Sequence, residues 1–114
     1  VVLCHCSQCR KAQGGAFGVN APVDADRFDL DDRQGTLVEY ESSAGKLRAF
    51  CGRCGSPLYS RLRSRPEVIR LRVGTLDTPV DVRPSAHIFA ASNATWERIT
   101  DELPQYDARE PGRE

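Results

Sequence analysis

The sequence of 114 residues lacks the features that define several large classes of protein. No apolar run approaches the roughly 18 residues that span a bilayer, and no charged segment precedes an apolar one at the start, so we expect neither a membrane protein nor a signal peptide. Net charge is also lacking, because 16 Lys and Arg residues balance 16 Asp and Glu residues. This balance removes the electrostatic basis for nonspecific binding to nucleic acid or to an anionic membrane, and it favours a small molecule or a protein as partner.

A complete disulfide framework is excluded as well, because the number of cysteines, 5, is odd. All of them lie in two short clusters, Cys4-His5-Cys6-Ser7-Gln8-Cys9 and Cys51-Gly52-Arg53-Cys54. The first spacing lets three thiolates converge on one point and the second adds two more, as in structural and catalytic zinc sites. Closely spaced cysteines of this kind favour a reducing compartment, so we predict a cytoplasmic zinc protein.

The number of thiolates leaves two interpretations open. Two tetrahedral zinc ions need four ligands each, so 5 thiolates leave three of the eight positions vacant if each cluster holds its own ion. One vacancy would mark an open, reactive site, and the others would be filled by His87, by a carboxylate or by residues upstream of Val1. Alternatively, one ion takes four of the thiolates, which leaves one cysteine spare and no catalytic position.

The pattern of apolar residues predicts one mainly β, sandwich-like domain with little helix, built around the zinc knuckles. We expect strands at 16–19, 36–41, 46–50, 57–62 and 68–73. Short helical turns are expected at 10–12, 24–30 and 94–99, and a hairpin connection at 42–45. The domain would cover residues 1–106, followed by a polar tail at 107–114 that we expect to be disordered.

Several single residues have a plain structural interpretation. We expect His5 to lie beside the site or at the surface, not to bind metal, and His87 to be a half-buried histidine with its hydrogen bonds satisfied. We expect three aromatic residues in the core, namely Phe89, Trp96 and Tyr106. Four arginines alternate with apolar residues as on the solvent face of a sheet, namely Arg61, Arg63, Arg70 and Arg72.

The sequence resembles the family of glutathione-dependent formaldehyde-activating enzymes, whose domain is shared with centromere protein V. The first matching motifs are Cys4-His5-Cys6-Ser7-Gln8-Cys9-Arg10-Lys11, Gly14-Gly15-Ala16-Phe17 and Phe50-Cys51-Gly52-Arg53-Cys54-Gly55-Ser56-Pro57-Leu58. Further matches are Val73-Gly74-Thr75-Leu76-Asp77, His87-Ile88-Phe89 and Trp96 followed by Leu103-Pro104-Gln105-Tyr106. Each motif alone is weak, but their order and spacing hold from Cys4 to Tyr106.

The resemblance implies an Mss4-like β fold with two zinc sites of different character. It assigns Cys4, Cys6 and Cys9 to a catalytic zinc with an open fourth position, and Cys51 and Cys54 to half of a closed structural site. In the family the other half is an upstream C-x-C pair, which we expect to lie before Val1.

The same resemblance implies a carbon–sulfur lyase similar to S-(hydroxymethyl)glutathione synthase. Zinc would deprotonate glutathione or another small thiol, which then adds to formaldehyde or another small aldehyde. Arg10 and Lys11, next to the cluster, would offset its negative charge or bind a carboxylate of the thiol substrate. The alternative, from a different class, is a non-catalytic zinc module that binds a protein partner.

Overall fold

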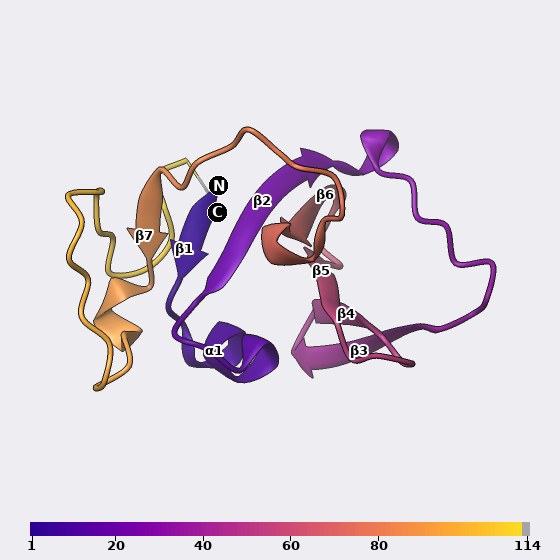
Figure 1. Ribbon diagram of the computed structural model, residues 1–114, viewed down its shortest axis with the longest axis horizontal. Helices are drawn as coiled ribbons and strands as arrows, with labels where there is room; N and C mark the ends of the chain where they lie inside the picture. The colour runs from indigo at the N-terminus through magenta and orange to yellow at the C-terminus, as the bar shows by residue number, and fades with distance from the viewer. Residues whose placement is uncertain (113–114) are drawn as a thin grey trace. The chain divides into compact units, whose positions relative to one another are not determined.

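The computed structural model describes residues 1–112 and is built mainly from β-strands (Figure 1). The strands are β1 (Val2–Cys4), β2 (Gly18–Asp24), β3 (Leu37–Ser43), β4 (Lys46–Cys51), β5 (Pro57–Leu62), β6 (Arg65–Arg72) and β7 (Ala86–Ile88). The helices within the described residues are α1 (Ser7–Gln13) and three 3₁₀ turns, η1 (Ala25–Arg27), η2 (Val73–Thr75) and η3 (Ala90–Ser92). The prediction of a mainly β fold with little helix is confirmed. It is consistent with the Mss4-like class.

The chain forms two compact units. The first contains Val1–Asn20 together with the segment that begins at Thr78, and the second contains Ala21–Asp77. The first cysteine cluster therefore belongs to the first unit, and Cys51 and Cys54 belong to the second.

In the first unit, β1 lies between two neighbours (Figure 1). It pairs antiparallel with β2, with Val2 opposite Asn20, and parallel with β7, with Cys4 opposite Ile88. Its three residues are all buried, because both edges and both faces of this short strand are covered. The buried residues Val2, Cys4, Cys9 and Ile88 form a small core, against which Phe89 and Tyr106 pack. The first cysteine motif thus starts on a fixed, buried strand.

The second unit contains four antiparallel strands in the order β3-β4-β5-β6. The turn between β3 and β4 contains Gly45 at a φ of 75°, a left-handed conformation that glycine adopts without steric cost. Its core is formed by Ala49, Tyr59 and Ile69. The expected strands are all present, although β2 begins at Gly18 instead of residue 16 and β6 begins at Arg65.

The helical turn expected at 94–99 is limited to residues 94–97, and the core position predicted for Trp96 is wrong. The chain makes a single turn there, closed by a hydrogen bond from Glu97 N to the Ala94 carbonyl, and the Asn93 side chain donates to the Glu97 carbonyl. Side-chain bonds of this type compete with helix formation. Trp96 is 68% exposed, whereas Phe89 and Tyr106 do pack against the core.

The predicted solvent face of arginines is wrong at Arg72, which is 4% exposed. Its Nη1 donates to the Arg70 carbonyl at 3.1 Å, so the guanidinium is satisfied in part by the backbone of its own strand. The long apolar stem of an arginine can pack against apolar neighbours. Alternation along a strand therefore does not by itself decide whether an arginine lies in solvent.

The C-terminal segment follows β7 and is attached to it by backbone hydrogen bonds. His87 N donates to the Pro104 carbonyl, Tyr106 N to the His87 carbonyl, and Phe89 N to the Ala108 carbonyl. Of the tail expected to be disordered, residues 113–114 lie outside the described residues. Within residues 1–112, no helix has the length and apolar character needed to cross a bilayer.

Candidate metal centre

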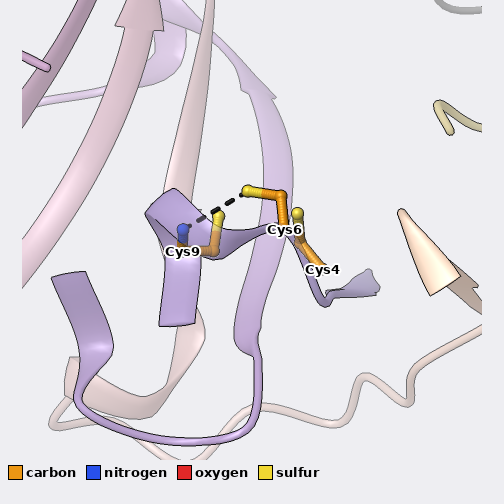
Figure 2. Close-up of side chains that lie close together, drawn as sticks. All are labelled: Cys4, Cys6 and Cys9. Atoms are coloured by element: carbon orange, nitrogen blue, oxygen red, sulfur yellow. Dashed lines mark hydrogen bonds between the residues drawn. The ribbon is translucent and has the colours of Figure 1, made fainter. Parts of the chain in front are cut away.

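The three cysteines of the first cluster converge on one point because a strand end, a helix cap and a helix turn follow one another without a gap. Cys4 ends β1, Cys6 is the N-cap of α1, and Cys9 lies in the first turn of that helix. Their sulfur atoms all lie within 4.8 Å of one another. Figure 2 shows the three side chains gathered at the start of α1. Cys4 and Cys9 are buried, and Cys6 is half-buried. The access to the cluster is therefore on the Cys6 side.

The helix that carries the cluster is short and is capped at both ends. Cys6 Sγ accepts a hydrogen bond from Cys9 N at 3.3 Å, which takes the place of the usual hydroxyl or carboxylate cap (Figure 2). Gly14 ends the helix with a φ of 69°, and its N–H donates to the Arg10 carbonyl. The helical turn expected at 10–12 is therefore present as the last part of α1.

The electrostatics of the cluster favour a bound cation. Hydrogen bonds with the Cys6 and Cys9 side chains raise the pKa of the Cys4 thiol well above its usual range, and burial raises it further. Three sulfurs this close in a buried site cannot all be thiolates unless a positive charge lies between them. A metal ion supplies that charge, and three thiolates are the donor set that zinc and other soft metals prefer. The residues present therefore fit a metal ion.

Asn20 contacts the cluster and was not expected from the sequence. It is 5% exposed, and its Nδ2 lies 4.0 Å from Cys9 Sγ, at the limit of an N–H···S hydrogen bond. The position faces Val2 across the β1–β2 ladder. A polar residue between Val19 and Ala21 in a strand is the signal that could have identified it.

His5 lies between two of the cysteines and is completely buried, so the alternative of a surface histidine is wrong. Its Nε2 lies 2.8 Å from Nδ1 of His87, and the Phe17 ring meets its ring edge-on at 5.3 Å. Burial and the neighbouring His87 ring lower the pKa of His5, which favours the neutral imidazole.

His87 connects His5 to Asp101 at the surface. It is 2% exposed, more buried than expected, and its Nε2 lies 2.9 Å and 3.0 Å from the two carboxylate oxygens of Asp101. The hydrogen bond from His87 is the main reason why the pKa of Asp101 is lowered. Asp101 was missed because nothing in its sequence context, Thr100-Asp101-Glu102, distinguishes it from a solvated carboxylate.

Arg10 and Lys11 lie in the last turn of α1, beyond the cysteines. Arg10 is half-buried and its Nε has no hydrogen-bond partner among the described residues, whereas Lys11 is exposed. Basic side chains in the last turn of a helix also suit its dipole. Both residues therefore follow the cysteine cluster directly on the same helix.

Cys51 and Cys54 form a tight turn in the second unit. Gly55 N donates to the Cys51 carbonyl at 2.7 Å, and Cys51 N donates to the Ser56 carbonyl at 2.9 Å. The backbone N–H groups of Cys54 and Arg53 point at the Cys51 sulfur and lower its pKa to about 7. Such a turn stabilises a thiolate ligand. Within Ala21–Asp77, however, no further His, Cys, Asp or Glu joins this pair to make a group of three.

Comparisons with known proteins identify the family of this chain. A crystal structure of a Rhodobacter sphaeroides protein, solved as a structural-genomics target, matches with a TM-score of 0.53 and 25% identity, over 69% of this chain and 70% of that one. The family model described as glutathione-dependent formaldehyde-activating enzyme matches residues 1–92, which include both cysteine clusters and β7. With the buried three-cysteine knuckle in place, the chain therefore belongs to the glutathione-dependent formaldehyde-activating enzyme family.

Proposed function

We propose that this protein is a zinc-dependent carbon–sulfur lyase that adds glutathione, or a similar small thiol, to formaldehyde or another small aldehyde. The observation that carries the proposal is the group of three sulfurs from Cys4, Cys6 and Cys9, which no fourth ligand of the described first unit joins. Three protein ligands and one free position are the pattern of catalytic zinc, whereas structural zinc has four protein ligands.

The chemistry requires a thiol to lose its proton at neutral pH. Zinc held by Cys4, Cys6 and Cys9 would supply a site at which an incoming thiol is stabilised as thiolate. In the overall reaction a carbon–sulfur bond forms, the C=O π electrons move to oxygen, and that oxygen gains the proton that the thiol loses. The product of glutathione and formaldehyde is S-hydroxymethylglutathione.

The protein residues contribute position and charge. Burial of Cys4 and Cys9 leaves the half-buried Cys6 side as the approach for a small thiol. Arg10 and Lys11 on the adjoining helix provide positive charge for a substrate carboxylate. The side-chain N–H group of Asn20 lies near Cys9 Sγ and stabilises the negative charge on that sulfur.

We further propose that Cys51 and Cys54 are half of a structural zinc site. The pKa of Cys51, lowered to about 7 by backbone N–H groups, suits a thiolate ligand. The remaining ligands are not among Ala21–Asp77. Since metal-binding cysteines of this kind are typical of reducing compartments, we also propose that the protein is cytoplasmic.

The proposal is tested by the rate at which ¹³C-formaldehyde exchanges with its glutathione adduct, measured by NMR exchange spectroscopy. The zinc-loaded protein should raise this rate above the uncatalysed exchange. The Cys6→Ser variant should return it to the uncatalysed value. A serine hydroxyl is a good N-cap, so this variant keeps the cap of α1 while it loses a metal ligand.

Ser7→Ala is the matched control, because Ser7 is exposed and adjacent to Cys6 but is not one of the three sulfur ligands. It should exchange formaldehyde at the wild-type rate. Full activity in a folded Cys6→Ser protein would contradict the mechanism. Zinc binding by the wild type without any acceleration, over a range of thiols and aldehydes, would instead support a non-catalytic zinc module.

A further inference from the structure

A chain of hydrogen bonds connects the cysteine knuckle to an acidic residue at the surface. It runs from His5, between Cys4 and Cys6, to His87 on β7 and then to Asp101. His5 and His87 are 0% and 2% exposed, whereas the Asp101 side chain is 46% exposed. We propose that Asp101 is a positioning residue for the metal centre, acting through His87 and His5; this rests on the proposed metal site but not on its activity.

The direction of the hydrogen bonds follows from counting protons. The ionised carboxylate of Asp101 can only accept, so the proton of a neutral His87 lies on Nε2. His87 Nδ1 is then a lone pair, and it must accept from His5 Nε2–H. Asp101 therefore fixes one tautomer in both rings.

The fixed His5 ring in turn holds the main chain between two ligands. The buried His5 ring packs against two other rings, with its centroid 5.0 Å from that of His87 and 5.3 Å from that of Phe17, which it meets edge-on. Its backbone N–H also donates to the Ile88 carbonyl at 3.0 Å, next to the pair of Cys4 with Ile88. The ring that Asp101 orients through His87 therefore belongs to the residue that joins Cys4 to Cys6, and we expect its orientation to affect where those two sulfurs lie.

Asp101 is itself held in position by its local turn. The Leu103 N–H donates to Asp101 Oδ1 at 3.0 Å, and the following residues are attached to β7 through Pro104 and Tyr106. The carboxylate is thus part of the same attachment that fixes the C-terminal segment. In metal sites, the hydrogen bonds around the ligands commonly contribute 10- to 100-fold in metal affinity.

The experiment compares two uncharged substitutions of similar size, Asp101→Asn and Asp101→Leu. The asparagine keeps an oxygen that accepts from His87 Nε2–H, and the leucine does not. Zinc affinity is measured by competition with a chromophoric chelator, and the ring ¹⁵N shifts of both histidines report their tautomers. We expect about a 10-fold loss of affinity and mixed tautomers in Asp101→Leu, and near wild-type values in Asp101→Asn. Glu102→Leu replaces a carboxylate by leucine at the exposed neighbouring position, and it should change neither the zinc affinity nor the tautomers.

Other outcomes would overturn the inference. Unchanged zinc affinity in a folded Asp101→Leu protein would do so, and so would an equal loss in Asp101→Asn and Asp101→Leu. If Asp101→Leu does not fold, Asp101→Ala takes its place in the same comparison. Because affinity and tautomers are measured without substrate, a wild type that binds zinc but does not accelerate aldehyde exchange would overturn the proposed function and leave this test intact.

Discussion

Arg61 on β5 holds the carboxylate of Glu39 on β3 with two hydrogen bonds, across the intervening strand β4. Arg61 Nε lies 2.8 Å from Oε2 and Nη2 lies 2.9 Å from Oε1. The Tyr59 hydroxyl donates to the same carboxylate at 2.7 Å. These side chains can meet across β4 because Ala49, which lies opposite both Glu39 and Tyr59, has a small side chain. This ion pair therefore links β3 to β5 across β4.

Glu39→Gln should lower stability at neutral pH but not in acid. The Arg61 hydrogen bonds are the main reason why the pKa of Glu39 falls from 4.5 to about 2. A lowered pKa contributes stability above the unfolded value and loses it as the pH falls from about 4.5 towards 2. The free energy of unfolding should drop by about 1–2 kcal/mol at pH 7, after allowance for partial exposure. Urea unfolding at several pH values should show the wild-type and variant curves converge near pH 2.

Glu41→Gln is the control for that series. Its pair with Arg63 is longer, at 3.3 Å, and both side chains are about half exposed, at 47% and 60%. We expect a change within about 0.5 kcal/mol. Parallel curves for wild type and Glu39→Gln down to pH 2 would show that the ion pair does not act as described.

Gly52→Ala should destabilise the second knuckle. A Cβ at Gly52 would lie 2.9 Å from Val38 Cγ2 and 3.0 Å from the Thr36 carbonyl oxygen, which accepts the Gly52 N–H. We expect a loss of about 1–3 kcal/mol, as for other overpacked sites, measured by thermal unfolding. Gly74→Ala has open space and should be neutral or slightly stabilising, so equal losses at the two glycines would contradict the steric explanation.

Asn20→Asp should weaken metal binding at the first knuckle. The substitution keeps the shape of the side chain but replaces the N–H donor near Cys9 Sγ with a buried acceptor. Repulsion between carboxylate and thiolate should lower zinc affinity by about 10-fold or more in a chelator competition assay. Asn20→Leu removes the donor without adding charge and should lose less; a larger loss in Asn20→Leu would indicate that packing, not charge, is what Asn20 provides.

The intrinsic fluorescence should report an exposed indole. Trp96 is the only tryptophan of the sequence and is 68% exposed. Emission of the folded protein should lie close to that of the urea-unfolded protein, and iodide should quench both to a similar extent. A blue-shifted folded spectrum that iodide does not quench would show that Trp96 is covered, for instance by a second copy of the chain.

The local parts of the candidate site were predictable from the sequence. The C-x-C-x-x-C spacing, with Gly14 after it, gave a capped turn that brings three sulfurs together. This was possible because the three ligands and the cap lie in one short continuous segment, Cys4 to Cys9, whose local geometry depends on residues that are near in sequence.

The parts that depend on distant contacts were not predictable. The side chains of His5 and His87 are 82 residues apart, and no period or propensity relates them or adds Asp101. The predictions that Arg72 is exposed and that Trp96 is buried were wrong for a related reason. Alternation shows which residues share a face of a strand, but what covers that face is decided by the rest of the chain.

The parallel pairing of β1 with β7 also has a consequence for how the protein is made. Strand β1 leads directly into the three-cysteine knuckle, yet its partner β7 follows all the other strands of the described residues. During synthesis on the ribosome the knuckle is translated first, but it has no parallel neighbour until residues 86–88 have emerged. Closing so long a loop is slow compared with forming local turns. The metal centre is thus begun first and completed late, and nascent chains must keep three thiols reduced throughout that interval.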